Sequence, residues 1–490
     1  MDQTLLGRDL DNLIGGRFVS ARSKETFEKR SPHDGALLCR AARSTSADVD
    51  DAVAAARAAQ PDWARTPPVA RGALLHAFCN LLEANTKEIA RTVALETGKT
   101  PAEAAGETGG AIALGRFFAG EGQRLYGRTT TSGQPNRYAM TVRQPCGVAA
   151  LIIAANTPIA NVAWKVFPAL VAGNAAILKS AEDAPATAEV FARLARKAGL
   201  PAGVLNVLNG LGEECGAPLV EHDGVDVISF TGSARVGRWI AETAGRKLKK
   251  VSLELGGKNP LVVCDDADFD HAVRWAALSA FSNAGQRCAS ASRIIVFDTV
   301  YEDFRARFVA AAENLRLGPE DGCDLGPVIN ERQLKNMLAA VGKAKAAGAA
   351  VLAGGRRLDG PEHAKGCYMA PTVIEGAGAE DEITRTELFG PVACLYRVRD
   401  FGEALALANT SPYGLTAAIH TTSYDRAMQF TQEARAGVVT VNGGTYGSEP
   451  HMPFGGFGQS GNGSREPGTE ALDVYCELKD VYHMVRPEKL

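Results

Sequence analysis

Residues 148–179 read VAALIIAANTPIANVAWKVFPALVAGNAAILK, and this stretch decides the class of fold that we expect. Val148–Ile153 and Ala175–Lys179 are apolar runs of strand length, and Trp164–Ala172 between them has apolar residues at helical spacing. Strands that are apolar throughout are typical of a parallel sheet covered on both faces, with helices as the connections. The stretch therefore predicts a doubly wound α/β sheet.

The same alternation extends along most of the chain. Further apolar strands are expected at Val204–Leu208, Val227–Thr231 and Lys250–Glu254, with helices between them at 184–198, 215–221 and 235–244. Residues 260–440 repeat the pattern with longer helices, at 269–283, 300–315, 331–347 and 401–409. Upstream, Thr45-Ser-Ala-Asp48 is typical of a capping box that opens a helical section reaching residue 118. We therefore predict two α/β domains that meet near residue 256, and a strand-like tail at 470–485.

Composition and charge narrow the class of protein. The chain has 490 residues, enough for two or three domains, and its net charge of −3 gives no basic field for nucleic acid. The N-terminus lacks the apolar run of a secretory signal, and the most apolar run, 147–155, is too short to span a bilayer. Ten cysteines form no C-x-x-C and do not cluster with the eight histidines. We expect a cytoplasmic, metal-free protein with reduced thiols.

One cysteine is a candidate nucleophile. Residues 278–295 read LSAFSNAGQRCASASRII, with Cys288 among small residues that leave its sulfur approachable. A free cysteine is usually an inert core residue, which is the alternative interpretation. Polar neighbours on both sides, Asn283, Gln286, Arg287 and Ser290, favour the nucleophile.

Two glycine-containing turns follow apolar strands and suggest phosphate binding. The first, Gly210-Leu-Gly212-Glu-Glu-Cys-Gly216, has the wrong spacing for a dinucleotide fingerprint and is equally compatible with a plain turn. The second, Phe230-Thr-Gly-Ser-Ala-Arg-Val-Gly237, would place Gly232 and Ser233 at a helix N-terminus, where free N–H groups bind anions. Together the two turns indicate nucleotide binding.

Polar residues at the ends of three strands are candidates for the rest of a site. Lys179 and Glu182 suit ribose hydroxyls, or else begin a solvated helix. Glu254, in Glu254-Leu-Gly-Gly-Lys258, is a candidate general base at an apolar strand end, or a partner of Lys258 in a salt bridge. Asn156 is either a turn former or a donor to an oxyanion.

In combination these residues resemble the aldehyde dehydrogenase superfamily, in the family's order and over essentially the whole chain. The resemblance is carried by Asn156 with Trp164-Lys165, Lys179 with Glu182, Phe230-Thr-Gly-Ser233, Glu254-Leu-Gly-Gly-Lys258, Gly285-Gln-Arg-Cys288, Glu387-Leu-Phe-Gly-Pro391, and Pro453-Phe-Gly-Gly456 with Ser460-Gly461. The tail, 461–466 with 472–475, also looks like the semialdehyde-oxidising branches.

The resemblance implies oxidation of an aldehyde to a carboxylic acid with NAD(P)+. Cys288 would attack as a thiolate, and the Asn156 amide with the Cys288 N–H would hold the oxyanion. Hydride transfer to the nicotinamide would leave a thioester, which water activated by Glu254 would hydrolyse. Lys165 would be a further basic residue near the site.

The resemblance also assigns the cofactor site and corrects the interpretation of the turns. The pyrophosphate is expected at Gly232–Gly237, and Gly210–Gly212 would approach the adenine end. Glu387 would hold the nicotinamide ribose, with Phe389 beside it, while Lys179 and Glu182 would hold the adenine ribose. The residues expected to contact the cofactor are Ile152, Ile153, Ala154, Asn156, Lys179, Ser180, Glu182, Gly212, Phe230, Thr231, Gly232, Ser233, Val236, Glu254, Leu255, Gly256, Cys288, Glu387 and Phe389.

Some positions depart from the family pattern and bear on the choice between NAD and NADP. Ser180 stands where proline is usual, Ala155 where tryptophan is often found, and Ala234-Arg235 where Thr-Glu is more common. Arg235 adds a positive charge near the phosphates. The Glu182 carboxylate would repel a 2′-phosphate, so we expect NAD, with NADP as the alternative.

The family's architecture implies three structural units. The cofactor-binding domain would comprise 1–126 and 144–256, and the catalytic domain 257–460. A small β oligomerisation element would comprise 127–143 and 461–490. The expected assembly is a homodimer or a homotetramer, with no nucleic-acid or membrane partner.

The expected substrate is a small polar or anionic semialdehyde. The aldehyde tunnel would be lined by Thr157, Asn161, Trp164, Arg287, Tyr446, Ser448 and Phe454, several of which are polar. Arg287 would pair with a distal carboxylate or sulfonate and favour the thiolate, or would instead point into an internal salt bridge. Aromatic or simple aliphatic aldehydes are the alternative substrates.

Three other functions would use some of the same residues. A Cys–Glu–Lys amidohydrolase would use Cys288, Glu254 and Lys165 but has no use for the nucleotide-binding residues. A CoA-acylating dehydrogenase would lack the glutamate present here as Glu254. A catalytically silent binding protein would not need every reacting position, and all of them are present.

Overall fold

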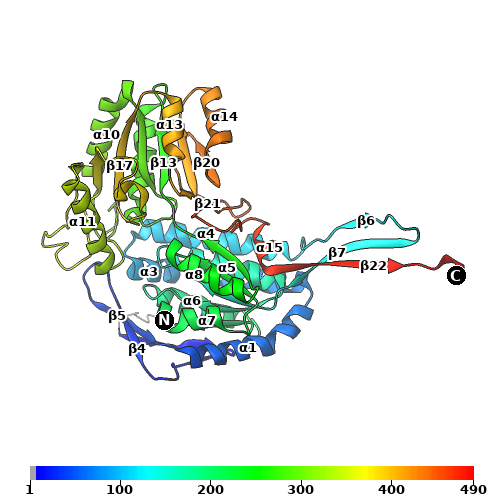
Figure 1. Cartoon of the computed structure of the whole chain (residues 1–490). Coiled ribbons are helices and arrows are strands. Elements are labelled where there is room, and N and C mark those ends of the chain that lie inside the picture. Colours follow the sequence, from blue (N-terminus) through cyan, green and yellow to red (C-terminus); the bar gives the residue numbers. More distant parts are fainter. Residues whose placement is uncertain (1–6, 490) are drawn as a thin grey trace.

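The apolar stretch at 148–179 forms the middle of a seven-stranded sheet in the computed structural model, which describes residues 7–489 (Figure 1). The sheet order is β12-β11-β8-β9-β10-β2-β3, and the five strands from β12 to β10 are parallel. The strands are β8 (Val148–Ile152), β9 (Ala175–Lys179), β10 (Leu205–Leu208), β11 (Val227–Thr231), β12 (Lys250–Glu254), β2 (Asn12–Ile14) and β3 (Arg17–Val19). Every residue of β8, β9 and β10 is buried, which is why these strands lack polar alternation.

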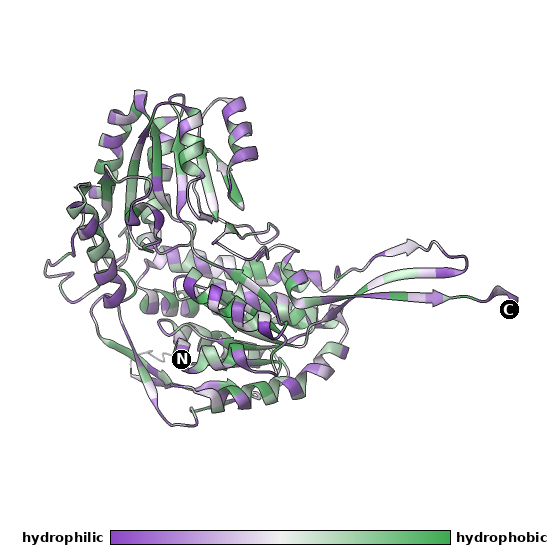
Figure 2. Cartoon of the chain, in the orientation of Figure 1, coloured by the Kyte–Doolittle hydropathy of each residue, from purple (hydrophilic) through white to green (hydrophobic). Residues whose placement is uncertain are grey.

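Helices cover both faces of this first sheet, as a doubly wound fold requires. One apolar cluster packs α2 (Pro68–Ala84), α3 (Thr86–Thr97), α4 (Pro101–Glu121), α5 (Pro158–Ala172) and α6 (Pro185–Lys197) on one face. A second cluster packs α1 (Ser46–Arg65), α7 (Ala217–Glu221) and α8 (Ala234–Arg246) on the other. In Figure 2 the hydrophobic residues gather along the strands and the inward helix faces.

A second seven-stranded sheet follows, in the order β15-β16-β17-β14-β13-β19-β20. Its strands are β13 (Asn259–Val263), β14 (Ala291–Phe297), β15 (Ala350–Ala353), β16 (Thr372–Glu375), β17 (Val392–Val398), β19 (Thr416–His420) and β20 (Val438–Val441). Its helices are α9 (Phe269–Phe281), α10 (Tyr301–Glu313), α11 (Glu331–Ala346), α12 (Glu382–Arg385), α13 (Phe401–Ala408) and α14 (Tyr424–Glu433). All of its strand pairs are parallel except β15 with β16.

A thin arm projects from the body of the molecule (Figure 1). It is an antiparallel sheet of β6 (Thr129–Thr131), β7 (Arg137–Pro145) and the C-terminal strand β22 (Cys476–Met484). The smaller remaining elements are β1 (Arg8–Leu10), β4 (Thr26–Arg30), β5 (Leu37–Ala42), β18 (Tyr413–Gly414), β21 (Phe457–Gly458) and α15 (Ala471–Tyr475). Among the described residues, no helix is both long and apolar enough to cross a membrane.

Three expected boundaries are wrong. The helix expected at 164–172 begins at Pro158, because proline fits the first turn of a helix, where its missing N–H would have no partner. The tail expected as strand from residue 470 begins with helix α15, and the strand starts only at Cys476. The segment expected as helix 215–221 begins inside a π turn over Gly212–Gly216, and the α-helix α7 starts only at Ala217.

Candidate active site

The candidate reacting groups lie where the two sheets meet. The first sheet presents its carboxyl edge, where β12 ends at Glu254, and the second presents its amino edge, where β13 begins at Asn259. Cys288 precedes β14 on that same amino edge, and Nδ2 of Asn259 donates to the Cys288 carbonyl at 2.7 Å. Within the first sheet, the strands β9 and β10 follow β8 on one side, and β11 and β12 lie on its other side. The order of the strands therefore reverses at β8, and open α/β sheets bind ligands at such switch points.

A cavity of about 300 Å³ lies at this junction. It is lined by Ala154, Asn156, Thr157, Asn161, Trp164, Thr231, Gly232, Ser233, Glu254, Leu255, Gly256, Cys288, Gln333, Glu387, Leu388, Phe389 and Phe454. The structure therefore brings the predicted nucleophile, oxyanion donor and general base into one cavity, although Cys288 and Asn156 are 132 positions apart in sequence (288 − 156).

The loop before Cys288 has an unusual backbone. Asn283, Ala284 and Gly285 have φ of 54°, 51° and 66°, so three consecutive residues occupy the left-handed region that disfavours residues with a Cβ. A Cβ at Gly285 would lie 2.1 Å from the carbonyl oxygen of Gly390, so only glycine fits there. Strain of this kind persists only where surrounding contacts impose it.

Those contacts come from a helix that the motifs did not include. The N–H of Asn283 donates to Oε1 of Glu103 on α4 at 2.6 Å. Four residues further on the same helix, Glu107 accepts from the N–H groups of Ile159 and Ala160 at the start of α5. One helix therefore holds both the nucleophile loop and the segment after Asn156. The sequence signal for this role was Glu103, which belongs to the Thr100–Glu103 capping box, with Glu107 four residues later on the same helix face.

The Asn156 side chain lies against the nucleophile loop. Its Nδ2 donates to the Gln286 carbonyl at 3.0 Å. The main-chain carbonyl oxygen of Asn156 accepts from Lys99 Nζ at 2.8 Å and from Asn283 Nδ2 at 3.2 Å. An amide carries two N–H groups, so the second can be donated to an oxyanion formed on the substrate of Cys288.

The carboxyl of Glu254 has the environment expected of a general base. Its side chain is buried, and within residues 7–489 neither oxygen has a hydrogen-bond partner. The alternative, a salt bridge with Lys258, is therefore not formed in the described part of the chain. Burial and then the negative charge of Glu466 raise the pKa of Glu254 well above its ordinary value, and Lys165 and Arg465 offset this in part.

The environment of Cys288 favours the thiol over the thiolate. Desolvation raises its pKa to about 12, with further increases from the carboxylates of Glu387 and Glu254. Desolvation within the cavity raises the pKa of Glu387, which is only partly exposed, to about 7, although the N–H of Gly257 donates to it at 3.0 Å. The positive charge needed to stabilise a thiolate must therefore come from elsewhere, as when a cationic group binds in the cavity.

This arrangement predicts the pH dependence of alkylation. We expect iodoacetamide to modify Cys288 slowly at pH 7 in the cofactor-free enzyme, with a rate that still rises at pH 9, because only the thiolate reacts. The E387Q variant removes a negative charge that disfavours the thiolate, so its rate at pH 8 should be several-fold higher. The measurement is mass spectrometry of the peptide containing Cys288. A rate that reaches its plateau below pH 8 would contradict the assignment.

Lys165 does not line the cavity, contrary to its predicted place among the catalytic residues. It is fully buried, and its Nζ donates to Glu466 at 2.8 Å and to Ser229 Oγ at 2.6 Å. Burying an ammonium is expensive unless a carboxylate neutralises it, which explains this orientation. Lys165 acts on the site through its charge, which lowers the pKa of Glu254.

Arg287 also differs from the prediction. Its Nη2 lies 3.6 Å from Oε1 of Glu103, and its guanidinium lies over the Tyr446 ring, 4.5 Å from the centroid. Neither Arg287 nor Tyr446 belongs to the cavity lining. The arrangement observed is the alternative interpretation, in which Arg287 forms an internal salt bridge, here with Glu103. Of the expected tunnel residues, Thr157, Asn161, Trp164 and Phe454 do line the cavity, and Ser448 is exposed.

The expected cofactor residues divide into two groups. The cavity lining includes Ala154, Asn156, Thr231, Gly232, Ser233, Glu254, Leu255, Gly256, Cys288, Glu387 and Phe389. The remainder lie outside it, at or just after the ends of β8, β9, β10 and β11 or in α8: Ile152, Ile153, Lys179, Ser180, Glu182, Gly212, Phe230 and Val236. Ser180 is buried and donates its hydroxyl hydrogen to Asn209 Oδ1 at 2.7 Å, so its side chain stabilises the fold.

The groups present fit a dinucleotide. Ser233 caps the 13-residue helix α8, whose N-terminus presents N–H groups suited to phosphates. Thr231 Oγ1 is buried without a hydrogen-bond partner in the described residues. A Cβ at Gly256 would lie 2.0 Å from Oε2 of Glu387, so glycine lets this carboxylate lie against the backbone.

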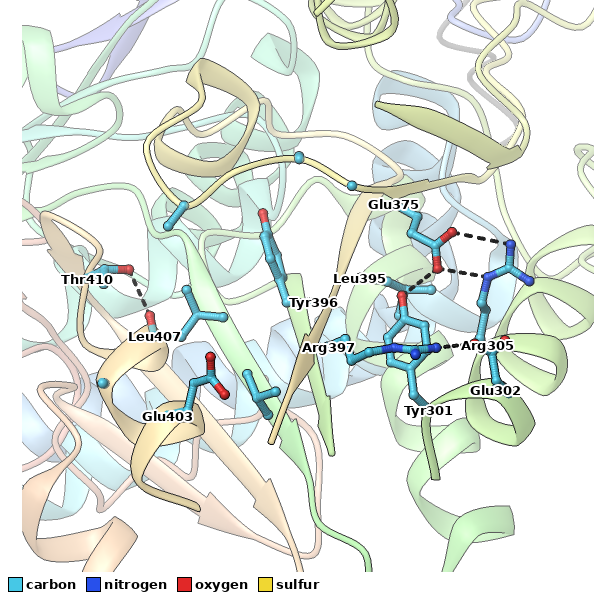
Figure 3. A pocket seen from close by; sticks show the side chains of 15 residues that line it. Tyr301, Glu302, Arg305, Glu375, Leu395, Tyr396, Arg397, Glu403, Leu407 and Thr410 are labelled. Atoms are coloured by element: carbon cyan, nitrogen blue, oxygen red, sulfur yellow. Dashed lines mark hydrogen bonds and ion pairs between the residues drawn. The ribbon is translucent and has the colours of Figure 1, made fainter. Parts of the chain in front are cut away.

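A larger hollow of about 850 Å³ lies on the second sheet, between α10, α13 and β17 (Figure 3), and its lining does not include Cys288. Four of its charged groups are paired with one another. Glu375 accepts from Tyr301 Oη at 2.6 Å and from Arg305 Nε at 2.9 Å, and Arg397 pairs with Glu302. These pairs stabilise the fold, and the lining of the hollow contains none of the predicted site residues.

Comparison with known proteins identifies the family. The model of the aldehyde dehydrogenase family matches residues 18–481. Alpha-ketoglutaric semialdehyde dehydrogenase of Bacillus subtilis is 37% identical over 474 residues, 96% of this chain and 97% of that protein. Alpha-ketoglutarate semialdehyde dehydrogenase of Haloferax volcanii is 40% identical over 473 residues, 96% and 98% of the two chains.

A solved structure supports the same family assignment. Betaine aldehyde dehydrogenase from Staphylococcus aureus, in complex with NAD+, superposes with a TM-score of 0.95 at 30% identity and covers 98% of this chain and 95% of its own. The predicted fold class and the predicted enzyme class are confirmed, and the enzyme depends on NAD or NADP. The chain belongs to the aldehyde dehydrogenase family and oxidises an aldehyde.

Proposed function

We propose that the enzyme oxidises a small polar or anionic semialdehyde to its carboxylic acid, with NAD+ preferred and Cys288 as the covalent nucleophile. The observation that carries the mechanism is the shared cavity, which holds Cys288, Asn156 and Glu254 at the junction of the two sheets. The named activities of the two relatives support the substrate class, because both act on alpha-ketoglutarate semialdehyde.

Each reacting group has one task in the first half of the reaction. Sγ of Cys288 bonds to the aldehyde carbon, and the carbonyl π electrons move to the oxygen. The amide of Asn156 and the N–H of Cys288 stabilise that oxyanion. Glu254, with its raised pKa, accepts the thiol proton through water. The hemithioacetal carbon, held on Cys288, would lose its hydride to the acceptor that a bound nicotinamide would supply, and the acyl group would remain on Cys288 as a thioester.

Deacylation uses Glu254 a second time, after it has released the thiol proton to solvent. Its carboxylate then takes a proton from a water molecule, and the resulting hydroxide oxygen bonds to the thioester carbon. The carbon–sulfur bond then breaks, the carboxylic acid leaves, and Cys288 returns to its thiolate. Both carboxylate oxygens are without a hydrogen-bond partner in the described chain, so they are available to orient this water.

The cofactor is assigned by charge and position. Ser233 and the start of α8 would hold the pyrophosphate, and Lys179 and Glu182 the adenosine ribose. Glu387 would hold the nicotinamide ribose. We propose NAD as the preferred cofactor because the Glu182 carboxylate would repel a 2′-phosphate. Comparable kcat/KM with NAD+ and NADP+ would contradict this preference.

The anionic substrate is proposed from the incomplete pairing of Arg287. Its nearest carboxylate, on Glu103, lies 3.6 Å away, beyond ordinary hydrogen-bond length. Its Nε is buried without a partner in the described residues. A guanidinium with unused donors one residue from the nucleophile suits the distal carboxylate of a semialdehyde. In the proposal Arg287, which lies outside the cavity lining, turns into the cavity, and the substrate carboxylate replaces Glu103 as its partner.

We expect the R287A variant to raise KM for a carboxylated aldehyde much more than for propanal. A charge-assisted hydrogen bond contributes about 1.5–3 kcal/mol, which corresponds to roughly 10- to 150-fold. Steady-state assays with succinate semialdehyde and propanal measure the difference. R287K, which keeps the charge without the planar fork, should lie between. An equal change in KM for both aldehydes would remove the role of Arg287.

A panel of aldehydes tests the proposed function as a whole. Semialdehydes, aromatic aldehydes and simple aliphatic aldehydes are compared by NADH formation, with the product identified as acid or CoA thioester. The proposal expects the acid as product and the highest kcat/KM for a semialdehyde. Higher efficiency with an aromatic or simple aliphatic aldehyde would overturn the substrate class, and a CoA thioester as product would overturn the role of Glu254.

We propose three structural units, an oligomeric assembly and a reducing compartment for this enzyme. We propose that the arm is the oligomerisation element of a homodimer or homotetramer, because Tyr138, Leu478, Tyr482 and Met484 on it are exposed. The division into cofactor-binding, catalytic and oligomerisation units follows the two seven-stranded sheets and the three-stranded arm. All ten cysteines are free thiols within residues 7–489, which supports a reducing compartment such as the cytoplasm.

A further inference from the structure

An ion pair joins the two α/β halves beside the residues assigned to the adenosine ribose. Arg332 is the second residue of α11, and its Nη2 lies 3.7 Å from Oε1 of Glu182 in the segment after β9. Next to it, Nδ2 of Asn330 donates to Oδ2 of Asp183 at 2.9 Å. The start of α11 is therefore fastened to the loop that carries Glu182.

The same helix start also reaches the reacting cavity. Asn330 caps α11 by accepting from the N–H of Gln333 at 2.9 Å. Gln333 lines the cavity that contains Cys288 and Glu387. Arg332 lies between Asn330, which binds Asp183, and Gln333, which lines the cavity. It therefore lies along the path of a dinucleotide that extends from Glu182 to Glu387.

The Arg332–Glu182 pair is held loosely. Its side chains are 69% and 37% exposed, and their separation exceeds hydrogen-bond length. Pairs of this kind contribute little in water, so the arginine can exchange one anion for another at small cost. A phosphate is the better partner, because it offers more charge and matches the guanidinium fork at two oxygens.

We propose that Arg332 is a specificity-determining residue for the 2′ position of the cofactor, and that it admits the 2′-phosphate of NADP beside Glu182. With a 2′-hydroxyl, Glu182 accepts the hydrogen bond and Arg332 stays paired with the carboxylate. With a 2′-phosphate, Arg332 turns to the phosphate and offsets the repulsion from Glu182. The inference rests on the proposed assignment of Glu182 to the adenosine ribose.

Equilibrium titration of the aldehyde-free enzyme with NADH and NADPH tests this without turnover. Energy transfer from tryptophan to the reduced nicotinamide gives each Kd. The R332Q variant should raise Kd for NADPH about tenfold and leave Kd for NADH within about twofold. R332K should retain most of the NADPH affinity. The difference between wild type and R332Q should shrink in 0.5 M salt, because the interaction is exposed.

K335Q is the matched control. Lys335 lies on the same helix, is 73% exposed and pairs with Glu331, so its substitution removes the same charge without touching Glu182. It should leave the ratio of the two Kd values unchanged. An R332Q variant that raises both Kd values equally, or neither, would overturn the inference. A wild-type enzyme that binds NADPH more tightly would overturn only the NAD preference, because Arg332 is judged by the change in the ratio.

Discussion

The C288S variant should lose about 10⁴-fold or more in kcat/KM, which corresponds to about 5.5 kcal/mol of transition-state stabilisation. A hydroxyl is a far weaker nucleophile than a thiolate at neutral pH, and no second thiol belongs to the cavity lining. NADH formation with a semialdehyde and NAD+ measures the loss. Binding of NADH and the melting temperature should change little, because the substitution removes no described hydrogen bond of the Cys288 side chain.

C323S is a suitable control for this prediction. Cys323 is a free, partly exposed cysteine in the loop before Leu325, outside the cavity, and its substitution should leave the rate unchanged. If C288S kept more than about 1% of wild-type activity with unchanged NADH binding, Cys288 would not be the nucleophile. A C288S enzyme that also lost NADH binding would show that the residue supports the cofactor site instead.

The parts of the fold that depend on local pattern could be predicted from the sequence. β8 and β9 are apolar at every position because helices cover both sheet faces, so their runs stand out from the rest of the chain. The start of α5 was missed because residues 156–161 contain Asn, Thr and Pro, which suit a loop as well as a helix N-terminus. Helix α15 was missed because its five residues are too few for a period to show.

The candidate site was predictable to the extent that it consists of short motifs. Cys288, Glu254 and Asn156 each stand in a local pattern that names a chemistry, and the structure places them together. The partners of Lys165 and Arg287 were not predictable in this way. Lys165 is paired with Glu466, 301 positions away, and Arg287 with Glu103 on a helix from the front of the chain. Each of these side chains is oriented by a carboxylate that lies close only in the folded protein and offsets its charge. No local sequence pattern predicts such a partner.

These pairings assign different tasks to the charges around the cavity. Lys165 neutralises Glu466 within the core, while Glu254 lacks any such partner in the described residues and keeps a raised pKa. An unpaired buried carboxyl is expensive, and its presence beside Cys288 is best explained by chemistry that uses it. The most informative substitution after Cys288 is therefore at Glu254.

The E254Q variant should stop the reaction at the thioester. Glutamine has nearly the same shape but cannot accept a proton from water, so we expect kcat to fall about 10²- to 10⁴-fold while one NADH per active site still forms in a burst. Stopped-flow absorbance measures the burst, and intact mass spectrometry detects the acyl group on Cys288. In the wild type, deacylation should accelerate with rising pH through a pKa above the ordinary carboxyl value, because only the carboxylate is a base. That pH dependence should be absent in E254Q.

E313Q makes the same change on the exposed side of α10 and should leave both phases unaltered. Two results would remove Glu254 from deacylation. One is a steady-state rate in E254Q equal to that of the wild type, since water would then be activated by another group. The other is a slow rate with no burst and no acyl adduct, because the block would then precede the thioester and Glu254 would act only on the Cys288 thiol. A trapped thioester with the burst intact assigns Glu254 to deacylation, and it means that another acceptor can take the thiol proton in the first half of the reaction.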